Sequence, residues 1–129
     1  MRYLTIAIAI ILLGCTSQYK LFRDKIQDQN LFLEQFGDAE KVPPRSAVIV
    51  LSKGEFKGFG GCNDYNGTYT MDKNYIHFKI NDIGTEVCDE LYKEREYINQ
   101  LVKTTNILIK GNRVLFTNKN KEPLLIYKK

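Results

Sequence analysis

Side chains that could perform catalysis are few in this chain of 129 residues. Its single histidine, His77, lies in a segment of alternating polarity, where a surface or cross-strand position is expected. No Cys or carboxylate stands near His77 at metal-ligand spacing, and no Ser or Cys occupies a recognisable nucleophile motif. The sequence therefore predicts no catalytic residue, no metal, no cofactor and no enzymatic activity.

Residues 1–14 have the features of a signal peptide. Arg2 gives a positive start, and an uninterrupted apolar run follows from Leu4 to Leu13. The run is too short to span a bilayer, which takes about 20 residues as a helix, but it suits the apolar core of a signal peptide. The residues before Cys15, Leu-Leu-Gly, resemble the bacterial lipobox, whose cysteine is acylated and becomes the new N-terminus. The alternative is an ordinary secretory signal with a chance cysteine near its end.

Lipidation of Cys15 would fix the location of the protein. Mature lipoproteins carry several acyl chains, and two or more chains give stable attachment. Thr16 follows the cysteine, where Asp would favour retention at the inner membrane. We therefore expect a cell-envelope location, on the periplasmic face of the outer membrane if the cell is Gram-negative. Residues 15–30 are expected to form the lipidated N-terminus and a polar tether, and residues 31–129 a single domain.

The remaining chain is patterned mostly as short strands. The run from Ala47 to Leu51 is apolar and β-branched, which predicts a strand buried on both faces or strongly curved. Asn66-Gly67 predicts a tight turn, because both residues tolerate positive φ. Further turns are expected at Asp72-Lys73-Asn74 and at Gly111-Asn112. The expected strands are 31–36, 47–51, 55–60, 75–83, 106–110, 114–117 and 124–127.

One segment, Asp89–Lys103, has helical periodicity and lacks Gly and Pro. Acidic residues lie at its start and Lys103 at its end, as the helix dipole favours. The predicted fold class is therefore mainly β (α+β): a small antiparallel barrel or curved sheet with one α-helix.

A cluster of motifs resembles the META domain, the family of HslJ-like heat-shock lipoproteins. The family has a Gly-Cys-Asn turn, an aromatic residue and Gly-x-Tyr, then Thr-x-x-Cys, and a helix with a Glu, an aromatic residue and a Leu. The matching residues are Gly61, Cys62, Asn63, Tyr65, Gly67, Tyr69, Thr85, Cys88, Glu94, Tyr97 and Leu101.

The resemblance implies a lipocalin-like β-barrel with one helix, an envelope location and a loose link to stress or drug tolerance. It implies no established enzymatic activity. The family usually opens with a Trp-x-Leu strand, and Leu31-Phe32-Leu33 stands in that place here.

The motif residues leave three alternatives open. With Cys15 lipidated, Cys62 and Cys88 remain in an oxidising compartment, where a disulfide is favoured over two buried free thiols. Gly60, Gly61, Asn63 and Gly67 are expected to give a backbone path with positive φ, although their amides could instead grip an anion. Glu94 either bonds to the Gly-Cys-Asn turn or lies solvated in the first turn of the helix.

Charge and composition restrict the partners. Loss of Arg2 with the signal peptide leaves 18 basic against 15 acidic side chains, a net charge of +3. This surplus does not predict nucleic-acid binding; it favours either a solvated surface or mild attraction to anionic lipid. The expected function is a monomeric envelope module, structural or binding an envelope protein under stress. The alternative is a binder of a small apolar or amphipathic ligand in the barrel mouth, which is less favoured because eight Tyr and seven Phe can fill a small barrel.

Overall fold

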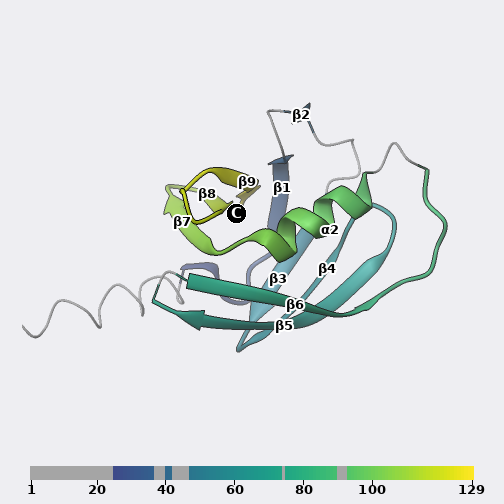
Figure 1. The fold of residues 1–129 in the computed structure, drawn as a ribbon, viewed down its shortest axis with the longest axis horizontal. Helices are drawn as coiled ribbons and strands as arrows, with labels where there is room; N and C mark the ends of the chain where they lie inside the picture. Colours follow the sequence, from purple (N-terminus) through teal and green to yellow (C-terminus); the bar gives the residue numbers. More distant parts are fainter. Residues whose placement is uncertain (1–24, 37–39, 42–46, 74, 90–92) are drawn as a thin grey trace, which may run out of the picture.

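One antiparallel sheet of nine strands contains most of the described residues (Figure 1). The computed structural model describes residues 25–36, 40–41, 47–73, 75–89 and 93–129. The strands are β1 (Leu31–Phe36), β2 (Glu40–Lys41), β3 (Val48–Ser52), β4 (Glu55–Phe59), β5 (Asp64–Asp72), β6 (Tyr75–Ile83), β7 (Asn106–Lys110), β8 (Arg113–Thr117) and β9 (Pro123–Lys128). Between β6 and β7 lies the helix α2 (Glu94–Lys103).

The strand order is β2-β1-β3-β4-β5-β6-β7-β8-β9, so that β1 lies between β2 and β3, and consecutive strands are neighbours from β3 to β9. The sheet bends so far that β1 also pairs with β9, so that the two ends of the meander meet. Opposite this junction, β6 and β7 share a single residue pair, Tyr75 with Asn106. Of the two predicted forms, the fold is therefore the curved sheet and not a fully closed barrel. The prediction of a mainly antiparallel β fold with one helix is confirmed.

Large side chains fill the concave side of the sheet. Phe78 and Phe116 stack with their ring centroids 5.4 Å apart, and Phe116 lies 4.7 Å from Tyr127. All three side chains are at most 1% exposed. Their burial, with that of Ile49, Leu51, Leu101 and Leu125, gives the sheet its stabilising apolar core.

The helix α2 lies across the concave side (Figure 1) and contacts β6 and β9. Tyr97, Ile98 and Leu101, at helical spacing, form its buried face. It ends at Lys103, as predicted, but begins at Glu94, five residues later than the predicted Asp89. Lys93 precedes it in the left-handed conformation (φ 47°), so the chain turns sharply into the helix. Residues 90–92 of the predicted helix lie outside the described residues.

The prediction of a turn at Asn66-Gly67 is wrong. Both residues lie within β5, and a bulge occurs between them where the register with β6 shifts. The hairpin turn between β5 and β6 follows Asp72, as predicted, with Lys73 at φ 56°. Gly67 is required by close approach, since an added Cβ would collide with the carbonyl oxygen of Lys79 and the ring of Phe56. The conformational freedom of Asn66-Gly67 is therefore used for a β-bulge within β5 and not for a hairpin turn.

The strand β3 alternates between buried and half-buried residues within a strongly bent sheet. Of the two alternatives for this apolar run, strong curvature agrees better with the structure than full burial on both faces. One further detail differs from expectation. Ile26, expected in the tether, is 3% exposed and belongs to the core. Every buried apolar side chain of the described residues lies between Ile26 and Tyr127. Among the helices of the described part of the chain, none has the length and apolar character needed to cross a bilayer.

Candidate functional site

The Gly-Cys-Asn turn joins β4 to β5 and presents its amides to the start of α2. Gly61 has φ 106°, a conformation that side chains resist, so the tight path requires glycine there. The turn is closed by a hydrogen bond of 2.9 Å from the Gly60 amide to the carbonyl oxygen of Asn63. Asn63, at its end, is 6% exposed.

Glu94, the first residue of α2, binds this turn through both carboxylate oxygens. Its Oε2 accepts hydrogen bonds from the backbone amides of Cys62 (3.0 Å) and Asn63 (2.7 Å). Its Oε1 accepts from Nδ2 of Asn63 at 2.8 Å. Hydrogen bonds to a charged acceptor are among the stronger ones in proteins. Of the two alternatives left open for Glu94, the structure has the one in which it bonds to the turn.

The side-chain amide of Asn63 also holds the connection that follows β6. Its Oδ1 accepts from the Glu86 amide at 2.9 Å, and its Nδ2 donates to the Glu86 carbonyl oxygen at 3.1 Å. The amide therefore pairs with Glu86 as a neighbouring strand would. Gly84 makes room for it, because a Cβ there would lie 2.7 Å from Oδ1.

A disulfide between Cys62 and Cys88 links the same segments covalently. The two Cα atoms are 5.9 Å apart, within the usual range for a disulfide. Nδ2 of Asn63 lies 3.3 Å from the Cys88 sulfur. The disulfide and Asn63 thus fasten the connection to the β4–β5 turn, and Glu94 fastens the helix to that turn.

Deeper in the core, three tyrosine hydroxyls form a chain. Tyr65 donates to the carbonyl oxygen of Val48 at 3.2 Å. The hydroxyls of Tyr65 and Tyr97 are 2.7 Å apart, as are those of Tyr97 and Tyr127. A hydroxyl has one hydrogen, so Tyr97 must donate to Tyr65, and Tyr127 must donate to Tyr97. The chain connects β5, α2 and β9 through the core.

Burial controls the titration of these hydroxyls. Loss of hydration raises the pKa of Tyr65, Tyr97 and Tyr127 well above the ordinary value of 10.0. In all three cases the neighbouring tyrosine hydroxyls contribute less than burial does. The three side chains are therefore neutral at any physiological pH and serve as hydrogen-bonding groups.

Most of the motif residues singled out in the sequence lie in these two networks or pack beside them. Leu101 is fully buried on the inner face of α2, and Tyr69 packs against Phe78 with ring centroids 6.1 Å apart. Thr85 is exposed and lies outside both networks. His77 is exposed on β6, opposite Thr70.

The expectation of positive φ holds for Gly61 alone. Gly60, Asn63 and Gly67 have negative φ. Gly60 is required for space instead, since a Cβ there would lie 2.8 Å from Oε2 of Glu94.

Sequence reasoning missed Tyr127, which completes the tyrosine chain. Its only signal was its place in the alternating pattern of the last strand.

The hydrogen-bonding groups of this arrangement are paired with one another. Both Glu94 oxygens are occupied by donors on the chain, and the three tyrosine hydroxyls bond to one another away from solvent. Among the described residues, no group of three or more His, Cys, Asp or Glu side chains is placed to hold a metal ion.

The fold and these motifs agree with comparisons to known proteins. The META domain family profile matches residues 24–129, so the chain belongs to the META domain family. A search of curated protein sequences finds no match.

Solved structures of similar fold share little sequence with the chain. A DUF4847 family protein from Bacteroides vulgatus aligns with a TM-score of 0.66 at 12% identity, over 83% of this chain and 96% of its own. A protein from Burkholderia xenovorans aligns with a TM-score of 0.66 at 20% identity, over 84% of this chain and 87% of its own. At such identities the likeness supports the fold and says nothing of function.

Proposed function

We propose that the chain is a bacterial envelope lipoprotein whose META domain is a non-catalytic interaction or structural module acting under stress. Acyl chains on Cys15 would hold it on the outer membrane, facing the periplasm in a Gram-negative cell. The signal-like sequence of residues 1–14 and the Leu-Leu-Gly-Cys motif support the anchor. The disulfide between Cys62 and Cys88 is in keeping with an oxidising compartment.

The non-catalytic role is inferred from the hydrogen bonds that the motif residues make within the domain. A general acid or base must reach the substrate with a free proton or lone pair. Glu94 instead accepts three hydrogen bonds from Cys62 and Asn63, and the hydroxyls of Tyr97 and Tyr127 are buried and bonded. The motif residues therefore hold segments together and leave the outer surface for recognition.

A core filled by aromatic rings supports the interaction role over the alternative of a ligand in the barrel mouth. Tyr97, Tyr127, Phe78 and Phe116 occupy the space between the sheet and the helix. Two grooves, of about 410 and 460 Å³, are lined mainly by outward-facing residues of the strands. Recognition is therefore expected at the outer surface.

Metabolic labelling tests the anchor. Cells that express the chain and receive radioactive palmitate should yield a labelled protein of the mass expected for processing before Cys15. Cys15→Ser should abolish both the label and the cleavage, whereas Cys62→Ser/Cys88→Ser should keep them. A label that persists in Cys15→Ser would contradict the proposal.

Chemical cross-linking in intact envelopes, followed by mass identification, tests the interaction role. A reproducible protein partner should be captured by the wild type and by Lys57→Gln, a change on an exposed strand residue. Capture should fail with Leu101→Asp, which places a charge in the core. Capture of small molecules with no protein partner would contradict the interaction role and favour the ligand-binding alternative.

A further inference from the structure

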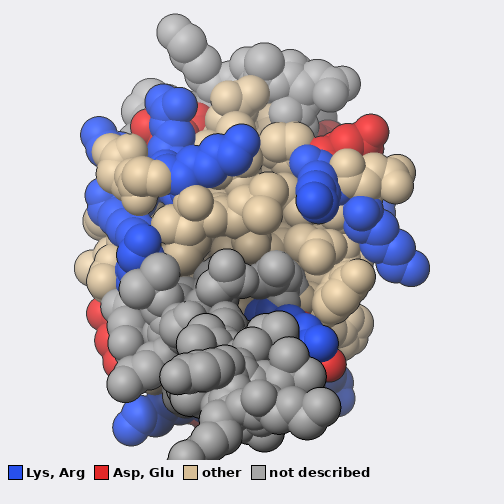
Figure 2. Space-filling view, turned by 90° about the vertical axis from the view of Figure 1, so that its left-hand side faces the viewer, with Lys and Arg blue, Asp and Glu red and all other residues tan. Residues whose placement is uncertain are grey.

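The charges are unevenly divided between two groups of strands in the sheet. Residues 106–129, which form β7, β8 and β9, carry six basic side chains and one acidic side chain. Residues 47–89, which form β3 to β6, carry four basic and six acidic side chains. Figure 2 faces the side of the molecule where β7 lies in Figure 1, and blue side chains there outnumber red ones around a tan surface. The small net charge of the chain thus conceals a basic side.

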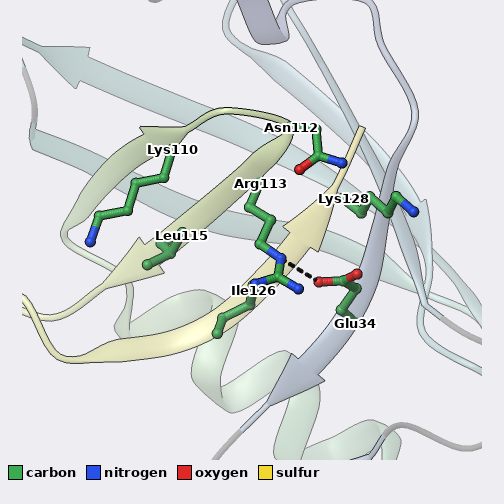
Figure 3. A pocket seen from close by; sticks show the side chains of 7 residues that line it. All are labelled: Glu34, Lys110, Asn112, Arg113, Leu115, Ile126 and Lys128. Carbon is green, nitrogen blue, oxygen red and sulfur yellow. Dashed lines mark ion pairs between the residues drawn. The ribbon is translucent and has the colours of Figure 1, made fainter.

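The groove of about 410 Å³ lies on this side of the sheet, on the outer face of β1, β8 and β9 (Figure 3). Leu115 and Ile126, both half-buried, give it an apolar floor. Arg113 lies at its centre, with Lys110 and Lys128 extending to either side. The groove therefore combines an apolar floor with a cationic rim.

One carboxylate moderates this charge. Nε of Arg113 lies 3.1 Å from Oε2 of Glu34 on β1. A guanidinium has five N–H donors, so this contact leaves others on Arg113 for a second anion. Lys110 and Lys128 are exposed, and neither makes an ion pair with any other described residue. The lining residues carry three positive charges and one negative charge, which favours an anion.

Next to the groove, β1 adds an exposed aromatic residue. Phe32 is 48% exposed and lies directly opposite Lys128 in the β1–β9 ladder. Apolar side chains beside cations are typical of surfaces that rest in the headgroup region of a membrane, where the apolar parts enter the acyl boundary and the cations meet phosphate.

We propose that the groove formed by Lys110, Arg113, Leu115, Ile126 and Lys128 binds the phosphate headgroups of anionic phospholipids and docks this face of the domain on the membrane. The inference deepens the proposed function, because a domain anchored by Cys15 has such a membrane within reach. It assigns an orientation to the anchored domain, with β8 and β9 toward the lipid and β3 to β6 toward the periplasm.

Vesicle sedimentation tests the groove without the anchor. Residues 16–129 contain the whole described core, from Ile26 to Tyr127, so the unacylated chain retains the fold. It should bind vesicles of equimolar phosphatidylglycerol and phosphatidylcholine, and binding should weaken as salt is raised. Binding should be absent from vesicles of phosphatidylcholine alone. Equal binding to both vesicles, or none to either, would overturn the proposal.

Matched variants separate the groove from net charge. Lys110→Gln/Lys128→Gln should lower the affinity for anionic vesicles by roughly tenfold to thirtyfold. Lys57→Gln/Lys79→Gln removes the same charge from exposed positions on β4 and β6, and should lower it less than threefold, roughly. An equal loss in both pairs would overturn the assignment to the groove.

Glu34→Gln should change the affinity for anionic vesicles in the opposite direction. It removes the one negative charge of the groove and should raise the affinity for anionic vesicles severalfold. An unchanged or lowered affinity would contradict the proposed site. Thermal unfolding of each variant checks that the fold is retained. The palmitate experiment is independent of these measurements, so failure of the anchor and failure of the groove are distinguishable.

Discussion

At the scale of the residue, Glu94 shows how one side chain can hold two distant segments together. It lies 31 positions from Asn63 in the sequence, yet its carboxylate accepts hydrogen bonds from the backbone and side chain of that residue. A carboxylate suits this place because it has only acceptors, and all three groups facing it are donors. Gln, the uncharged isostere, would place the N–H donors of its side-chain amide against a group that is itself a donor.

Glu94→Gln is therefore expected to destabilise the domain by about 1–3 kcal/mol. Glu96→Gln, an exposed change in the same helical turn, is the control and should change the free energy of unfolding by less than about 0.5 kcal/mol. Urea titration followed by circular dichroism measures both. Equal losses in the two variants would show that the charge acts on the helix as a whole and not on the turn.

The direction of donation among the three tyrosine hydroxyls leads to a second prediction at this scale. Tyr97→Phe leaves the buried hydroxyl of Tyr127 without an acceptor and should cost about 1–3 kcal/mol. Tyr127→Phe removes the hydroxyl at the end of the chain, leaves every remaining donor paired and should cost about 0.5–1.5 kcal/mol. The difference between the two variants in the free energy of unfolding tests the direction in which the tyrosine hydroxyls donate. A larger loss in Tyr127→Phe would reverse the assignment of donors.

At the scale of the element, the position of the connection from β6 to α2 depends on side-chain hydrogen bonds and a disulfide. Residues 84–89 form neither helix nor strand, and they are held by Asn63 and by the disulfide between Cys62 and Cys88. These contacts and the hydrogen bonds of Glu94 place both the connection and the start of α2 at the same turn.

Removal of the disulfide tests this dependence. Cys62→Ser/Cys88→Ser should lower the free energy of unfolding by about 3 kcal/mol, from a loop that closes 26 positions. Hydrogen exchange should quicken at residues 84–89 before it quickens in the sheet. A reducing agent should shift the wild type in the same way and leave the double variant unchanged. A uniform change in exchange would contradict the local role of the disulfide.

Much of the element structure could be predicted from sequence, for identifiable reasons. The alternation in Tyr75–Ile83 and the turn at Gly111 are local signals, and the structure agrees with both. The Asn66-Gly67 signal failed because the same backbone tolerance permits a bulge, and only pairing with β6 decides between them. Residues such as Tyr127 could not be assigned, because their partners come from distant segments and their spacing has no period.

At the scale of the whole molecule, the buried tyrosines connect stability to alkaline pH. Burial raises the pKa of Tyr65, Tyr97 and Tyr127 in the folded state above the ordinary value, while in the unfolded chain they titrate near 10. Above that pH the unfolded chain binds fewer protons than the folded one, so the free energy of unfolding falls as pH rises. Below it both states are protonated and the contribution is complete.

The melting temperature should therefore stay level from neutral pH to about pH 9 and fall steeply above about pH 10. Each tyrosine adds about 1.4 kcal/mol of lost stability per pH unit in that window. Thermal unfolding across this range measures the fall, which should be shallower in Tyr127→Phe. Tyr75→Phe is the control, since this side chain is 62% exposed and its replacement should leave the profile unchanged. A profile that is the same in all three proteins would contradict the assignment.

The pairing of β1 with β9 also determines when the domain can form during synthesis. A ribosome delivers β1 first, and β1 can pair with β3, but its pairing with β9 must wait for the end of the chain. Leu125 and Tyr127 of β9 are fully buried in the finished core. Until then the core stays open along one side, and its apolar surface is available to chaperones. If the chain is exported as proposed, this delay keeps it able to pass through a secretion pore, because the sheet cannot close before the last strand emerges.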